Sequence, residues 1–194
     1  MAYRFSSEEQ AKEFLINHLR AHFAIFENVG VETPTFLHHI LQPDLIITPK
    51  DKEHSDFLIA IEVKIGNPKS TRDYASHLKQ TIDYVLGRIS KINSSDELLK
   101  PLLGRVVQAA FIFPSYDESY FTGKREKLLR AYGMHQLAAR FKVGRATITD
   151  RGISLIMGAG ANEVWIEKHG WTPHARFLIS GNRQVGNQRL KFEF

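Results

Sequence analysis

The chain has 194 residues, of which 43% are hydrophobic and 24% charged, and it contains no cysteine. Its length is sufficient for a packed core. The lack of cysteine excludes a disulfide-stabilised secreted scaffold and a zinc site built on thiolates. Residues 1–123 carry 13 Lys and Arg against 16 Asp and Glu (net −3), whereas residues 124–194 carry 13 against 5 (net +8). A basic C-terminal part on an acidic body favours a polyanion such as nucleic acid as partner, with a merely basic surface as the alternative.

The N-terminal residues reach the charged pair Glu8 and Glu9 without an apolar segment, so we expect no secretory signal. No apolar run approaches the ~20 residues that a membrane span needs. We therefore expect a cytoplasmic protein that does not interact with membranes. The absence of internal repeats and linkers predicts a single domain over residues 1–194.

The first predicted element is a helix over residues 6–23. Ser6 and Glu9 match a capping box, and Phe5 is placed as the outer half of a hydrophobic staple. The spacing of the apolar residues places a buried stripe on one face of this helix. The stripe consists of Ala11, Phe14, Leu15, His18, Leu19 and His22.

Alternation with a period of two then predicts three strands, over residues 24–31, 43–48 and 56–64. The segment between the last two strands is polar and charged, which is typical of a turn. We therefore expect the second and third strands to form a hairpin.

A second helix is expected over about residues 70–89, followed by a polar loop over 91–100 and a buried strand over 105–113. A third helix is expected over residues 124–140. The glycine-rich remainder predicts short strands and turns. The order of these elements indicates an α+β domain, or an α/β arrangement in its central part.

The third predicted strand carries two charged residues on one face. Its β-branched residues must occupy one face, so Glu62 and Lys64 share the other. Burying a carboxylate and an ammonium on so apolar a strand requires compensation. Asp44 begins the preceding strand, and the hairpin brings it near Glu62. Two carboxylates beside an amine suit Mg²⁺; the alternative is an exposed cross-strand ion pair with Asp44 in a turn.

The pattern Pro43-Asp44, a spacer of 17 residues and then Glu62-Val63-Lys64 resembles the signature of the PD-(D/E)XK, or restriction-endonuclease-like, nuclease superfamily. The order of elements over residues 6–113 matches this superfamily too. The resemblance implies a core with a central mixed sheet flanked by helices. Residues 114–194 lie outside the resemblance and are expected to complete the domain as a basic, β-rich C-terminal extension.

A second pair of residues extends the resemblance. Gln80 and Tyr84 are spaced i, i+4 on the second predicted helix and project from one face. They are similar to the Gln-x-x-x-Tyr pair that lines the active site of RecB-like members of the superfamily. Packing of Tyr84 against the sheet is the alternative.

The resemblance implies a Mg²⁺-dependent deoxyribonuclease, a hydrolase that cleaves phosphodiester bonds. Asp44, Glu62 and the backbone carbonyl of Val63 would hold one Mg²⁺, which Mn²⁺ can replace. Many members add a glutamate from the first helix, and here Glu8 is favoured over Glu9 and Glu13. Lys64 would orient the attacking water and offset transition-state charge, and Gln80 would position Lys64 or the backbone. A homodimer is compatible with cutting two strands, although no motif indicates one.

The basic part offers two interpretations. Residues 135–151 resemble a helix-turn-helix, which would make the protein a non-catalytic DNA-binding protein with Arg145 on a recognition helix. Residues 143–157 also have the alternation of a β-hairpin, and we favour the hairpin. In that case the basic side chains contact DNA phosphates rather than read bases. The residues expected to do so are Arg140, Lys142, Arg145 and Arg151.

Overall fold

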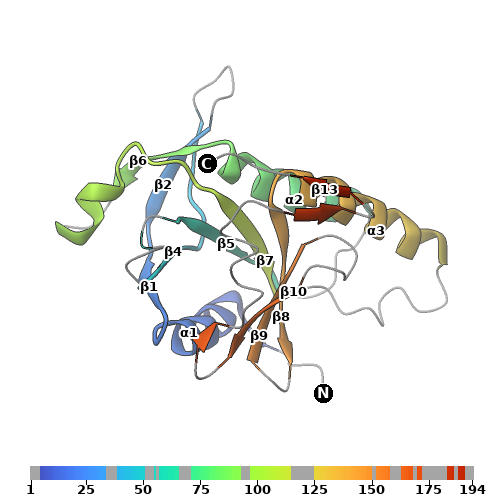
Figure 1. Cartoon of the computed structure of the whole chain (residues 1–194), viewed down its shortest axis with the longest axis horizontal. Coiled ribbons are helices and arrows are strands. Elements are labelled where there is room, and N and C mark those ends of the chain that lie inside the picture. Colours follow the sequence, from blue (N-terminus) through green and yellow to red (C-terminus); the bar gives the residue numbers. More distant parts are fainter. Residues whose placement is uncertain are drawn as a thin grey trace.

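A computed structural model of the chain shows an α+β fold in which a mixed central sheet is flanked by helices (Figure 1). The residues that the structure describes are 5–33, 39–50, 55, 57–65, 71–92, 97–114, 125–149, 152–157, 163–167, 170–171, 183–185 and 188–190.

The central sheet has eight strands, in the order β1-β4-β5-β7-β8-β9-β10-β11. Their bounds are β1 Phe23–Phe26, β4 Leu45–Pro49, β5 Ile59–Val63, β7 Ala109–Phe113, β8 Val143–Thr149, β9 Gly152–Ile156, β10 Glu163–Glu167 and β11 Gly170–Trp171. Strand β7 pairs in parallel with both β5 and β8, and the other neighbours are antiparallel. One sheet therefore joins the segment that contains Asp44, Glu62 and Lys64 to the basic C-terminal part.

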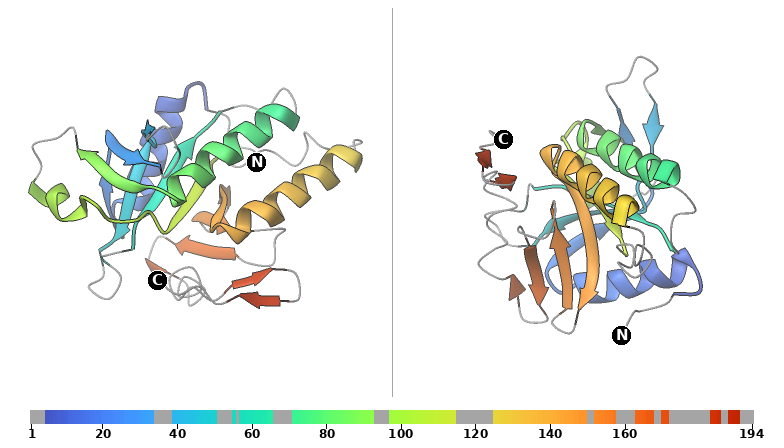
Figure 2. Two further views of the ribbon diagram at one scale, coloured as in Figure 1. Left: turned by 90° about the horizontal axis from the view of Figure 1, so that it is seen from above. Right: turned by 90° about the vertical axis from the view of Figure 1, so that its right-hand side faces the viewer.

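Helices cover both faces of this sheet. The three helices are α1 Glu8–Leu19, α2 Thr71–Val85 and α3 Arg125–Arg140. On one face, α1 buries Ala11, Leu15 and Leu19 against the sheet. On the opposite face α2 and α3 lie side by side (Figure 2). Because both faces are covered, the central strands are almost entirely apolar.

The predicted alternation of β5 is confirmed. Ile59, Ile61 and Val63 belong to the apolar cluster under α1. Ala60 belongs to the cluster under α2. Because side chains alternate along a strand, Glu62 projects toward α2.

Smaller elements surround the central sheet. A second sheet has the order β3-β2-β6, with β2 Val29–Glu32, β3 Ile40–Leu41 and β6 Arg88–Ile92. A 3₁₀ helix spans Glu97–Leu102. A two-stranded sheet pairs β12 Arg183–Val185 with β13 Gln188–Leu190.

The start of α1 differs from the predicted capping box. Ser7, not Ser6, caps the helix, because the Ser7 hydroxyl oxygen accepts a hydrogen bond from the Gln10 backbone N–H at 3.1 Å. The Gln10 side-chain oxygen in turn accepts from the Ser6 backbone N–H at 2.7 Å. Glu9 instead forms an ion pair with Lys12 at 3.0 Å. The helix ends at Leu19, four residues earlier than predicted, and of the predicted stripe His18 is exposed.

The strand predicted over residues 24–31 is in fact two strands in different sheets. Asn28 separates β1 from β2 with a φ of 58°, a left-handed conformation that asparagine tolerates better than most residues. The second helix ends at Val85 instead of about 89, because residues 88–92 pair with β2. The predicted loop over 91–100 accordingly contains the end of β6 and the start of the 3₁₀ helix.

The C-terminal part of the chain excludes the helix-turn-helix. The predicted third helix is confirmed as α3, but the residues after it form the antiparallel pair β8 and β9. Gly144 allows these strands to approach closely, since a Cβ there would lie 2.3 Å from the Ile156 carbonyl oxygen. The favoured β-hairpin is therefore confirmed for the residues that the structure describes, and its predicted tip, which includes Arg151, lies outside them.

Candidate active site

The hairpin of β4 and β5 brings the two predicted carboxylates together. Leu45 lies opposite Ile61 in antiparallel register, so Asp44 sits beside the last residues of β5. The Asp44 Oδ2 atom accepts a hydrogen bond from the backbone N–H of Val63 at 2.7 Å. The register of the hairpin thus holds one carboxylate directly beside the strand that carries the other.

Glu62 is 3% exposed and meets three donors. Its Oε1 atom accepts from Lys64 Nζ at 2.6 Å and from Gln80 Nε2 at 2.9 Å. Its Oε2 atom accepts from the Tyr84 hydroxyl at 2.6 Å. These contacts provide the compensation that a buried carboxylate requires.

Burial and hydrogen bonding oppose each other at these groups. Burial raises the pKa of Glu62, while the hydrogen bonds from Lys64 and Tyr84 lower it less strongly. Burial acts to lower the pKa of Lys64, but the bond to Glu62 and the negative charges of Glu62, Glu8 and Asp44 raise it above its usual value. Burial and the Glu62 charge raise the pKa of Tyr84 strongly, so its hydroxyl remains a donor.

Helix α2 supplies the other two predicted site residues. Gln80 and Tyr84 are one turn apart, and Gln80 Nε2 also donates to the Tyr84 hydroxyl at 2.8 Å. Gln80 is expected to position Lys64 or the backbone; in the structure its amide donates to Glu62 Oε1, the atom that also binds Lys64. The carboxylate is the stronger acceptor, and Gln80 orients it from above the sheet.

Two further residues lie near this cluster. Glu8 is exposed in the first turn of α1, and its negative charge raises the pKa of Lys64. His77 is half-buried on α2, and the charges of Lys64 and Glu8 both act on its pKa. Our sequence analysis did not identify His77, although its position three residues before Gln80 places it on the same helix face.

The oxygen atoms of the cluster fit a hard cation. The Lys64 ammonium contacts both Glu62 Oε1 at 2.6 Å and the Val63 carbonyl oxygen at 3.1 Å. These are two of the three groups that the superfamily resemblance assigns to Mg²⁺, so a positive charge already occupies the place expected for the metal. Within the described part of the chain no three His, Asp or Glu side chains come together as a ready-made metal site.

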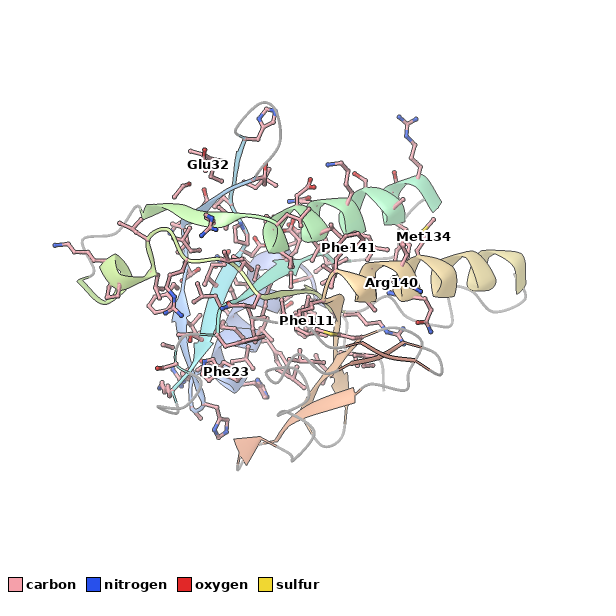
Figure 3. All side chains as sticks on the ribbon, turned by 45° about the horizontal axis from the view of Figure 1, so that its top comes forward. Phe23, Glu32, Phe111, Met134, Arg140 and Phe141 are labelled. Carbon is pink, nitrogen blue, oxygen red and sulfur yellow. The ribbon has the colours of Figure 1, made fainter. Side chains whose placement is uncertain are left out.

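The predicted phosphate-binding residues are spread along α3 and β8. Arg140 is exposed in the last turn of α3, beside Phe141 (Figure 3). Lys142 follows in the turn before β8, near the N-terminal end of β7. These two residues lie near the N-terminal ends of β7 and β8, whereas Glu62 lies at the C-terminal end of the parallel strand β5.

Arg145 is the exception among the basic residues. It lies opposite Ile112 of β7, which in turn lies opposite Glu62 of β5. Side chains in one such row project to the same face. Arg145 is therefore two strands from Glu62, on the face that α2 covers.

No family model, curated protein or solved structure matches the chain. Among the described residues, no helix has both the length and the apolar character needed to cross a membrane. The chemistry of the cluster around Glu62 is thus the main guide to function.

Proposed function

We propose that the protein is a metal-dependent nuclease that hydrolyses phosphodiester bonds of DNA. The observation that carries this proposal is the position of the Lys64 ammonium, in contact with Glu62 Oε1 and the Val63 carbonyl oxygen. A cation-binding pair of oxygens, a second carboxylate on Asp44 and a movable amine are the groups that such hydrolysis requires.

Asp44, Glu62 and the Val63 carbonyl would hold the divalent ion, with Glu8 at the nearby start of α1. Bound there, Mg²⁺ or Mn²⁺ supplies Lewis-acid stabilisation of the negative charge that develops on the phosphoryl oxygens. All the proposed ligands are hard oxygen atoms, as these ions prefer.

The residues around the site hold the Glu62 carboxylate and the backbone of Lys64 in place. Tyr84 and Gln80 each donate to Glu62, which holds the carboxylate in place when the Lys64 bond is lost, and the Tyr84 bond also lowers the pKa of Glu62. The Lys64 backbone N–H donates to the Phe113 carbonyl oxygen at 2.8 Å. The backbone of Lys64 is therefore anchored, and its side chain alone swings toward the substrate to orient water and offset phosphate charge.

A nucleic acid is the substrate class that the charge distribution favours. The net charge of +8 over residues 124–194 provides a basic region for a polyanion. The β8 strand of that region pairs with β7, next to the strand that carries Glu62. Arg145 is the basic residue of β8, and its place in the same row of the sheet as Glu62 supports a phosphate contact near the cluster.

A panel of labelled substrates tests this proposal. Supercoiled plasmid, single-stranded DNA, branched DNA and RNA are incubated with and without Mg²⁺, using wild-type protein and the Glu62→Gln variant. We expect Mg²⁺-dependent cleavage of a DNA substrate by the wild type and none by the variant, because Gln lacks the carboxylate charge. Equal cleavage by both proteins, or none by the wild type on any substrate, contradicts the proposal.

A further inference from the structure

We propose that His77 contacts the substrate, by donating a hydrogen bond to a phosphate oxygen of the strand that is cut. This inference rests on the proposed nuclease function and adds a residue that the superfamily signature does not contain. Its basis is the placement of His77 on α2 and the groups that surround it.

The orientation of α2 determines where His77 lies. Gln80 and Tyr84 both bond to Glu62, so the helix face that carries them is turned toward the end of β5. His77 precedes Gln80 by three residues and Tyr84 by seven, a spacing that keeps all three on one face. His77 is therefore the next residue along α2 on the face that forms the candidate site.

The charged neighbours of His77 are those of the site. Lys64, Asp73 and Glu8 act electrostatically on its ring. Lys64 and Glu8 belong to different elements from His77, and Lys64 also bonds to Glu62. The end of β5 and the start of α1 are therefore both within electrostatic reach of His77.

The chemistry of an imidazole ring suits a phosphate at this position. A neutral ring keeps one N–H donor and adds no positive charge beside Lys64. Burial, with the positive charge of Lys64, lowers the pKa of His77, which keeps the ring neutral at ordinary pH. His77 is half-buried and so retains exposed surface, whereas Tyr84 is fully buried.

Three variants separate a substrate contact from a structural role. His77→Ala removes the donor and His77→Gln restores an N–H donor of similar reach, and both residues are good helix formers. Lys79→Ala is the matched control, because Lys79 lies on the same helix, is exposed and pairs only with Asp83 among the described residues. The measurements are kcat/KM for DNA cleavage, Mn²⁺ affinity by calorimetry and thermal unfolding.

We expect His77→Ala to lower kcat/KM by about 10- to 100-fold, the range for a lost hydrogen bond to a charged group. Mn²⁺ affinity and the unfolding temperature should stay close to wild type, and His77→Gln should recover much of the activity. Lys79→Ala should behave as the wild type. Wild-type cleavage by His77→Ala overturns the inference while leaving the nuclease proposal intact.

Loss of Mn²⁺ binding or of thermal stability in His77→Ala, without rescue by His77→Gln, assigns the residue a structural role and also overturns the inference. A wild-type protein that cleaves no substrate with any metal removes the nuclease proposal, and the inference about His77 with it. The outcomes thus distinguish failure of the inference from failure of the proposed function.

Discussion

Glu62 is stable inside an apolar sheet because each of its oxygen atoms meets a donor. Lys64 and Gln80 share Oε1, and Tyr84 holds Oε2. Single substitutions at the partners of Glu62 test these contacts one at a time. Two predictions at this scale concern Lys64 and Tyr84.

Lys64→Met should tighten Mn²⁺ binding while abolishing cleavage. The ammonium occupies the oxygen atoms that the metal needs, so the metal must displace it in the wild type. Calorimetric titration of metal into both proteins measures the change, and Lys79→Met controls for the loss of a distant charge. Weaker Mn²⁺ binding by Lys64→Met than by wild type contradicts the proposed overlap of the two cations.

Tyr84→Phe should raise the pH at which Mn²⁺ affinity declines on acidification. The hydroxyl bond to Glu62 lowers the pKa of that carboxyl, so its loss adds to the upward shift that burial causes. Titrations between pH 5 and 8 measure the midpoint, and an unchanged or lower midpoint argues against this role for Tyr84.

The sequence predicts those site residues whose positions follow from local strand pairing, and it misses those whose positions follow from helix packing. Asp44, Glu62 and Lys64 lie on two strands joined by a short hairpin, so alternation and spacing suffice to bring them together. The position of His77 depends instead on the angle at which α2 crosses the sheet, which no local pattern encodes. The actual partner of Gln80 depends on the same packing.

At the scale of elements, a buried polar contact joins the two helices that cover one face of the sheet. The Tyr74 hydroxyl of α2 is hydrogen-bonded to the His135 ring of α3, and both residues are buried. Burial and the positive charge of Arg145 lower the pKa of His135 to about 3. His135 therefore remains neutral in the folded protein at pH values where it is charged in the unfolded chain.

The lowered pKa of His135 predicts that the free energy of unfolding falls on acidification. The folded-state pKa of His135 is below its unfolded value of about 6.5. The stabilisation is thus complete above pH 6.5 and is lost as the pH falls toward 3. Urea unfolding from pH 8 to 4 should show a smaller decline in the free energy of unfolding for His135→Gln than for wild type.

Glycine substitutions test the β8–β9 hairpin. Gly144→Ala should lower the free energy of unfolding by about 1–3 kcal/mol, because its Cβ would meet the Ile156 carbonyl oxygen. Gly133→Ala on α3 has open space and should stabilise the protein by about 0.5–1 kcal/mol. Denaturant unfolding measures both. Stabilisation by Gly144→Ala would fit a helix at this position and contradict the hairpin.

The element boundaries show where sequence patterns are insufficient. Periodicity predicts the existence of α1, α2, α3 and the β4–β5 hairpin because each buries one continuous apolar face. It misses the break at Asn28, since both β1 and β2 continue the same alternation. The pairing of residues 88–92 with β2 is a long-range contact, and it ends α2 earlier than local preference indicates.

At the scale of the whole molecule, one sheet connects an acidic N-terminal part with a basic C-terminal part. The parallel β5-β7-β8 order places Glu62 and Arg145 in one row across three strands. Arg140 and Lys142 lie near the other end of these strands, at the N-terminal ends of β7 and β8. Bound DNA would therefore have to extend beyond the cluster around Glu62 to contact all three of these basic residues.

The salt dependence of DNA affinity measures how many of these basic residues contact phosphate. Replacing Arg140, Lys142 and Arg145 by Gln should flatten the log–log dependence of DNA affinity on salt by up to about 3 units if all three contact phosphate. The loss should be similar for unrelated sequences, because phosphate contacts carry no base information. An unchanged slope would show that the basic part does not bind the DNA backbone.

The most direct measurement of the central claim is a crystal structure of the protein soaked in Mn²⁺, with the metal located by its anomalous scattering. We predict one ion at coordination distance, about 2.1 Å for ions of this size, from carboxylate oxygens of Asp44 and Glu62 and from the Val63 carbonyl oxygen. The Lys64 ammonium should have left Glu62. An ion bound elsewhere, or a Lys64–Glu62 ion pair unchanged at saturating Mn²⁺, would contradict the account.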